Sequence, residues 1–104
     1  MKLNKMHKST KLFVDDVRQP PDSTWIIART AEEAMKILKS NKVDILSLDH
    51  DLGEGLSGYD IISWLEKKIY LKELEAPRKM LVHSANPVGA DNIRRAIKSI
   101  DRYK

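Results

Sequence analysis

The chain has 104 residues, of which 41% are hydrophobic and 33% charged, a composition that suits one globular domain with a single core. It contains no cysteine, which excludes a disulfide framework and a thiolate metal site. The net charge of +4 fits either a lysine-rich solvated surface or attraction to a phosphate-bearing partner, and charge alone does not separate the two.

The first ten residues are basic and polar. No apolar stretch of signal-peptide type follows them, and no apolar run approaches the roughly 18 residues that span a bilayer. We therefore expect a partly flexible leader at residues 1–10, a domain at residues 11–104, no membrane association and a cytoplasmic location.

Four short apolar runs predict strands, at residues 12–14, 25–28, 45–48 and 80–82. None of them alternates between polar and apolar residues. Continuous runs of this length are typical of strands that are buried on both faces, as in a parallel sheet covered by helices.

Three segments have the apolar spacing of amphipathic helices. The first begins after Thr30, which forms a capping-box pattern with Glu33, and should end near Ser40. The second follows Ser57. The third follows Asn86, with a proline in its first turn.

The predicted elements alternate in a way that favours a parallel α/β sheet with right-handed crossovers. The exception is the connection at residues 15–24, which holds two prolines and is too short for a comfortable crossover helix, so we expect a loop there. With strand order 2-1-3-4, the carboxyl ends of the first, third and fourth strands would be neighbours, and ligands of such sheets bind at those ends.

Acidic residues follow two of these strands. Asp15 and Asp16 come after the first, and Asp49 and Asp51 come after the third. Carboxylates that meet at one edge repel each other unless a cation lies among them, and their oxygens suit Mg²⁺, Mn²⁺ or Ca²⁺. Aspartate is also common in turns, so Asp16 or Asp51 could be a loop or capping residue. Two clusters at one sheet edge lead us to favour a divalent-metal site.

Two histidines occur near the same edge. His50 lies within the second acidic cluster, and His83 ends the fourth run. Two such side chains can supply the base and the acid of one reaction, or they can hydrogen-bond the surrounding carboxylates. Arg18 and Arg29 are the nearest cations, and each is either a phosphate clamp or an ordinary surface arginine.

From Leu12 onward the chain resembles the receiver domain of two-component response regulators. Residues 13–16 are similar to the acidic pair after the first receiver strand. Residues 43–49 and the following Gly58 are similar to the phospho-acceptor strand and its glycine, and Ser84-Ala85 to the Ser/Thr-Ala pair. The resemblance implies a flavodoxin-like three-layer sandwich of about four parallel strands in order 2-1-3-4, with the first helix and the fifth strand missing.

Two motifs differ from ordinary receivers, at residues 48–53 and 83–87. They resemble an offshoot of phages and bacteria, the cyclic-phosphate-processing receiver-like family. That resemblance implies action on cyclic phosphates, such as 2′,3′-cyclic RNA ends or related nucleotides, in RNA repair.

The hypothesis that follows is a phosphoesterase dependent on a divalent metal, with Mg²⁺ or Mn²⁺ as the expected cofactor. Its residues fall into three roles. They are Asp15, Asp16, Asp49 and Asp51 as metal ligands, His50, His83 and Asp49 as catalytic residues, and Arg18, Ser84 and Asn86 as phosphate-binding residues.

Two other functions remain open. One is a phospho-accepting signalling domain with Asp49 as nucleophile and Ser84 as switch hydroxyl, against which the missing phosphate-sensing lysine argues. The other is a non-catalytic module that binds nucleotides or RNA ends with salt-sensitive affinity. For all three hypotheses, we expect a monomer or a weak homodimer, because the edge after the fourth strand would be exposed.

Overall fold

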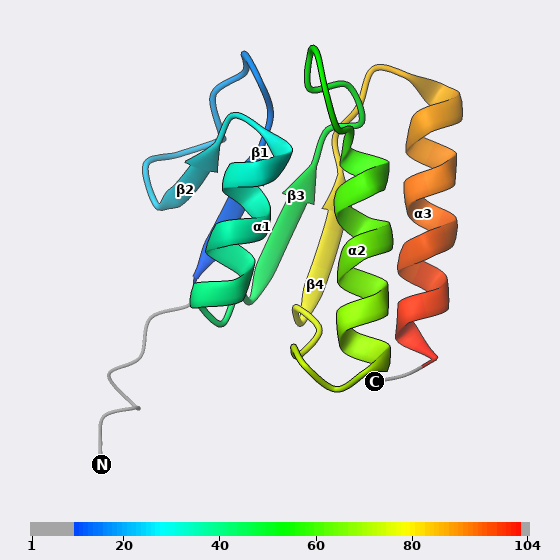
Figure 1. Ribbon diagram of the computed structural model, residues 1–104. Coiled ribbons are helices and arrows are strands. Elements are labelled where there is room, and N and C mark those ends of the chain that lie inside the picture. Colours follow the sequence, from blue (N-terminus) through cyan, green and yellow to red (C-terminus); the bar gives the residue numbers. More distant parts are fainter. Residues whose placement is uncertain (1–9, 103–104) are drawn as a thin grey trace.

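Four parallel strands form one sheet in the computed structural model, which describes residues 10–102 (Figure 1). The strands are β1 (Lys11–Val14), β2 (Trp25–Ala28), β3 (Ile45–Leu48) and β4 (Lys79–Val82). Their order across the sheet is β2-β1-β3-β4, which confirms the predicted order 2-1-3-4. The predicted leader lies, except for Thr10, outside the described residues.

Three helices occupy the predicted segments. They are α1 (Ala31–Ser40), α2 (Gly58–Tyr70) and α3 (Pro87–Asp101). Each begins at the predicted capping residue, because the side chains of Thr30, Ser57 and Asn86 all accept a hydrogen bond from the backbone N–H three residues further on. These bonds satisfy N–H groups that a helix start otherwise leaves without a partner. No helix among residues 10–102 combines the length and apolar character needed to cross a bilayer.

The helices cover only one face of the sheet. Leu12 and Val14 of β1 belong to the core that all three helices share, and so do alternate residues of β3. Phe13, which points to the opposite face, lies outside that core although it is buried. In Figure 1 the helices lie on the same side of the strands. Within residues 10–102 the architecture therefore has two layers, and the expected third layer is absent.

The exposure of the strands follows from this arrangement. The central strands β1 and β3 are almost completely buried, whereas the edge strands are partly exposed. Ile26 of β2 is 42% exposed and Leu81 of β4 is 38% exposed. The prediction of burial on both faces therefore holds for the central strands and is wrong for the edges, where each strand has a neighbour on one side only.

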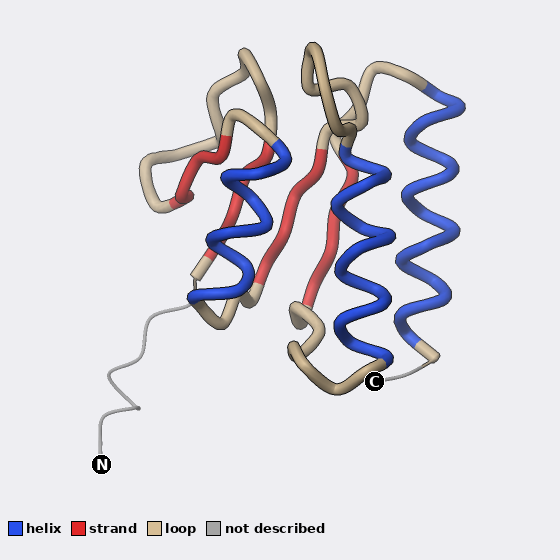
Figure 2. The backbone as a smooth tube through the Cα atoms, viewed as in Figure 1, coloured by secondary structure: helices blue, strands red, loops and turns tan. Residues whose placement is uncertain are grey.

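The loops after the strands gather at one end of the molecule (Figure 2). The predicted loop between β1 and β2 contains no helix, and it returns directly to the edge of the sheet. The loop after β3 closes when the N–H of Gly58 donates to the carbonyl oxygen of His50 at 2.8 Å. This closure places the start of α2 directly against the end of β3.

A substitution at Gly58 tests how closely the loop after β3 packs against the start of α2. Alanine in place of glycine within a helix ordinarily stabilises a protein by about 0.5–1 kcal/mol. In Gly58→Ala, however, the new Cβ would lie 2.0 Å from the carbonyl oxygen of Asp49, which belongs to the backbone and cannot rotate away. We expect the free energy of unfolding to fall by about 1–3 kcal/mol in urea titrations.

The matched control is Tyr59→Ala, at the adjacent exposed position. Its effect should stay within about 0.5 kcal/mol. Stabilisation of the protein by Gly58→Ala would contradict the close approach of the loop to the helix.

Candidate active site

Three carboxylates meet at the carboxyl ends of β1 and β3. Asp15, Asp16 and Asp49 each offer one oxygen, and these oxygens all lie within 4.8 Å of one another. Asp15 is completely buried and Asp49 is 7% exposed. Three negative charges at such separations, with little water to screen them, create a strong preference for a cation. The carboxylate pair predicted after β1 and the first aspartate after β3 are therefore brought together.

Hydrogen bonds fix the orientation of the buried Asp15 carboxylate. Its Oδ1 accepts from the N–H groups of Val17 at 2.9 Å and Arg18 at 2.8 Å. Its Oδ2 lies 3.1 Å from Nε2 of His83. A carboxylate has about four lone-pair directions, so these three bonds leave room for one cation contact.

The same bonds decide the charge of Asp15. Burial by itself would raise the pKa of this carboxyl group. The N–H groups of Arg18 and Val17, together with the nearby His83 ring, outweigh burial and lower the pKa below its ordinary value of 3.8. Asp15 is therefore an ionised acceptor at neutral pH.

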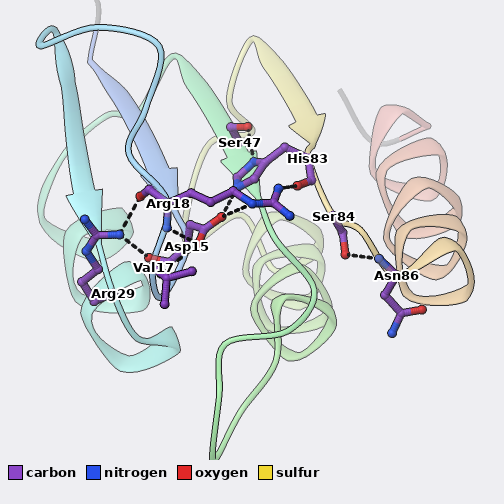
Figure 3. Close-up of polar contacts among 8 residues, drawn as sticks. All are labelled: Asp15, Val17, Arg18, Arg29, Ser47, His83, Ser84 and Asn86. Atoms are coloured by element: carbon purple, nitrogen blue, oxygen red, sulfur yellow. Dashed lines mark hydrogen bonds and ion pairs between the residues drawn. The ribbon is translucent and has the colours of Figure 1, made fainter.

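His83 connects the carboxylate to the interior of the sheet (Figure 3). Its Nδ1 lies 2.7 Å from Oγ of Ser47, and its Nε2 faces Asp15. The ring stacks on Phe13 with 4.3 Å between the ring centroids and 6° between the planes. Because ionised Asp15 can only accept, Nε2 must carry a proton, so the Nδ1 of a neutral His83 accepts from the Ser47 hydroxyl.

Two opposing effects act on the charge of His83. Its partial burial lowers the pKa, and the negative charge of Asp15 raises it. Burial prevails, and the pKa of His83 lies below its ordinary value of 6.5. The ring is therefore neutral at pH 7, with its side chain 19% exposed at the rim of the site.

Two arginines brace the β1–β2 loop above the acidic cluster. Arg18 donates from Nη1 to the carbonyl oxygen of His83 at 2.7 Å, and its Nε lies 3.9 Å from Oδ2 of Asp15. Arg29 donates to the carbonyl oxygens of Asp15 at 3.1 Å and Arg18 at 2.6 Å. The Arg18 side chain is 48% exposed. It therefore presents part of its guanidinium group to solvent beside the carboxylates.

His50 lies in a different environment from His83. Its Nδ1 is 3.0 Å from Oδ1 of Asp51, and its ring packs against the first turn of α3. A Cβ on Gly89 would lie 2.3 Å from the ring, so only glycine leaves space for it. Within the described part of the chain the two histidines share no hydrogen-bond partner, and their joint catalytic role remains a prediction. Asp51, whose side chain is 66% exposed, is not a member of the acidic cluster.

Ser84 and Asn86 shape the turn between β4 and α3. Oγ of Ser84 accepts from the N–H of Asn86 at 3.1 Å, and Oδ1 of Asn86 accepts from the N–H of Gly89 at 3.0 Å. Both side chains therefore have roles in the turn and cap. The Ser84 hydroxyl keeps its own proton for a further acceptor, and the phosphate contacts predicted for the two residues remain predictions.

A family model for the cyclic-phosphate processing receiver domain matches residues 10–99. The chain belongs to this family. No match was found among curated proteins or among solved structures. The predicted resemblance is thereby confirmed, and so is the receiver-like fold of four parallel strands and three helices.

The acidic cluster of this receiver domain has the donor set of a hard-cation site. Its three oxygen ligands suit Mg²⁺ or Mn²⁺, and they arise from the strand ends where receiver domains place their metal. A groove lined by Leu38, Val43 and Pro77 lies at the opposite end of the sheet, away from these carboxylates. The acidic cluster and this groove are therefore separate features of the fold.

Two residues that contact His83, namely Ser47 and Phe13, were not predicted from the sequence. Ser47 is the one polar residue within the apolar run of β3, and that interruption was the available signal. Phe13 could not be distinguished from other core residues, because an apolar run does not reveal which of its members face the helices.

Acid should destabilise the domain through His83. The pKa of His83 is lowered by folding, so on acidification the unfolded chain binds a proton near pH 6.5 before the folded chain does. The free energy of unfolding should therefore fall between pH 7.5 and pH 5, with a contribution from this group of at most about 1.4 kcal/mol per pH unit. Urea titrations in EDTA measure this dependence.

In His83→Gln, part of that slope should disappear, because the substituted side chain does not titrate. The lowered pKa of Asp15 adds a separate loss of stability only at lower pH, as the carboxylate is protonated below its ordinary pKa of 3.8. Identical slopes for the two proteins between pH 7.5 and pH 5 would contradict the neutral, hydrogen-bonded state of His83.

Proposed function

We propose that this receiver domain hydrolyses cyclic phosphate esters, with a nucleotide or RNA end that carries a 2′,3′-cyclic phosphate as substrate. The observation that carries the proposal is the meeting of three kinds of group at one sheet edge. Asp15, Asp16 and Asp49 provide a cation site, His83 is a neutral imidazole, and Arg18 is a partly exposed cation.

The proposed cofactor is Mg²⁺ or Mn²⁺, held by Asp15, Asp16 and Asp49. When bound, such a cation would offset the charge of the phosphate and polarise its oxygens. Without a cation, three carboxylates would repel an anionic ester, so the same cluster that makes the site acidic also makes its activity dependent on metal.

The chain's own groups supply binding and proton transfer. Arg18 donates N–H groups to the phosphate oxygens, and the exposure of its side chain leaves it able to do so. Water attacks phosphorus and loses a proton, the bond to one ribose oxygen breaks, and that oxygen gains a proton. In this proposal His83, which is partly exposed and neutral near pH 7, passes the proton from the water to that oxygen. To do so the ring must release one of its two bonds, to Asp15 or to Ser47.

His50 and Asp51 have a supporting part in this proposal. The His50 ring is wedged against Gly89 and bonds to Asp51, so the pair holds the loop after β3 in place beside α3. Ser84 and Asn86 extend the same edge, and their contacts to a phosphate remain part of the proposal.

A second candidate is phospho-acceptance at Asp49. The observation in its favour is the position of this carboxylate, which ends the central strand β3 and lies beside Asp15 and Asp16. A small-molecule phosphodonor such as acetyl phosphate would then label Asp49 when Mg²⁺ is present. The two functions are separable, because labelling leaves a protein-bound phosphoryl group and hydrolysis does not.

Hydrolysis should depend on the acidic cluster and on metal. With 2′,3′-cyclic mononucleotides and a cyclic-ended oligoribonucleotide, we expect turnover with Mg²⁺ or Mn²⁺ and none in EDTA. Asp49→Asn and Asp16→Asn should each lower kcat/KM by about 10²-fold or more, because each removes a cation ligand. Product formation by chromatography gives the rate.

Asp51→Asn is the matched control, since it makes the same chemical change in the same region at an exposed carboxylate outside the cluster. It should retain most of the activity. Inertness toward all cyclic phosphates with either metal, or full activity of Asp49→Asn, would overturn the proposal. Inertness combined with labelling of Asp49 by the phosphodonor would support the second candidate instead.

A further inference from the structure

The sheet face without helices carries its side chains in rows that cross all four strands. The parallel register places one residue from each strand side by side, and two such rows lie on this face. The eight residues of these rows, which we call the open face, are Trp25, Lys11, Ile45 and Lys79 in the first and Ile27, Phe13, Ser47 and Leu81 in the second. Two residues beyond the second row, just past the ends of β1, β3 and β4, the chain places Asp15, Asp49 and His83 of the acidic site.

Apolar side chains on the two edge strands of the open face are partly accessible to solvent. Ile27 is 36% exposed and Leu81 is 38% exposed, although parallel sheets ordinarily have both faces covered. Phe13 is shielded instead by other rings, because Trp25 lies edge-on at 6.0 Å between centroids and His83 stacks on it. The rings of Trp25, Phe13 and His83 thus form a compact group with aliphatic side chains on either side. Figure 3 shows His83 and Ser47 on this side of the sheet.

The charges on this face are positive. Nζ of Lys11 lies 5.1 Å from the centre of the Trp25 ring, and Lys79 is exposed at the other end of the same row. The eight residues include no carboxylate. Aromatic rings beside lysines on an exposed sheet are the combination that binds single-stranded nucleic acids, in which bases stack on rings and phosphates pair with cations.

A second copy of the chain fits this face less well. Two copies that met there would bring lysines of like charge into one interface. The accessible apolar surface is also small, since Phe13 is 6% exposed and Ile27 and Leu81 are each only about a third exposed, whereas a stable interface needs about 1,000 Å² or more.

We propose that the open face binds single-stranded RNA, with bases against Trp25, Ile27 and Leu81 and with phosphates at Lys11 and Lys79. Asp15 lies four positions beyond Lys11, just past the end of β1, which corresponds to about 13 Å. An RNA end that reaches the acidic cluster would therefore extend back over the open face. The direction in which the RNA lies, and the choice of RNA over DNA, rest on the proposed function. The binding of a single-stranded nucleic acid by the open face does not.

The test measures binding without chemistry. A fluorescent single-stranded hexaribonucleotide with a 3′-hydroxyl end is titrated in EDTA, and its anisotropy gives Kd at several salt concentrations. Lys11→Glu and Lys79→Glu should each raise Kd at least fivefold. Each should also reduce the slope of log affinity against log salt by about 0.7 per lost phosphate contact.

The matched control is Lys36→Glu, which makes the same charge change at an exposed position of α1, within the helical layer. Its Kd should remain within twofold of the unaltered protein. Equal losses for Lys36→Glu and Lys79→Glu would overturn the proposal, because they would show attraction by net charge alone.

A second measurement locates the contact directly. Trp64→Phe leaves Trp25 as the single tryptophan, so quenching of fluorescence by the hexamer in this variant supports stacking on the open face. Binding without quenching, no binding at low salt, or a dimer that Leu81→Lys dissociates would each overturn the proposal. Hexamer binding with no hydrolysis of any cyclic phosphate would remove the proposed function and leave this inference standing.

Discussion

The buried carboxylate of Asp15 has partners from two separate segments, and the carboxyl edge of the sheet is organised around them. The β1–β2 loop contributes the N–H groups of Val17 and Arg18, and the residue after β4 contributes the ring of His83. The Arg18 side chain joins the two segments by a bond to the His83 carbonyl oxygen. A buried ionised group without such partners would cost several kcal/mol. The need to satisfy one charge thus fixes the positions of the His83 ring and of the Arg18 guanidinium group beside the three carboxylates.

His83 also links the acidic site to the open face. One edge of its ring faces Asp15 and the other faces Ser47, while its flat side covers Phe13. A face that lacks helices would leave Phe13 in water, so stacking by His83 compensates for part of the missing layer. If the open face binds RNA as proposed, this partly exposed surface is also the path by which the RNA end approaches the acidic site.

The sequence predicted local structure well where a single residue type has a single effect. Thr30, Ser57 and Asn86 were identified as helix starts because their side chains satisfy backbone N–H groups within the same turn. The alternation of elements predicted a parallel sheet, and the strand order was what the resemblance to receivers implied. The expected third layer was wrong because an apolar run looks alike whether one face or both are covered, and only the packed helices distinguish Leu12 from Phe13.

At the site, the sequence by itself determined that Asp15, Asp16 and Asp49 would meet, because the carboxyl ends of neighbouring parallel strands converge at one edge. It did not determine which histidine belongs with them. His83 joins the carboxylates and His50 turns to α3 and Asp51, although both follow strands of the same sheet. That choice depends on which side of the sheet each ring occupies and on the space left by Gly89. Both are properties of the packed tertiary structure, and neither is encoded in the spacing of residues along the chain.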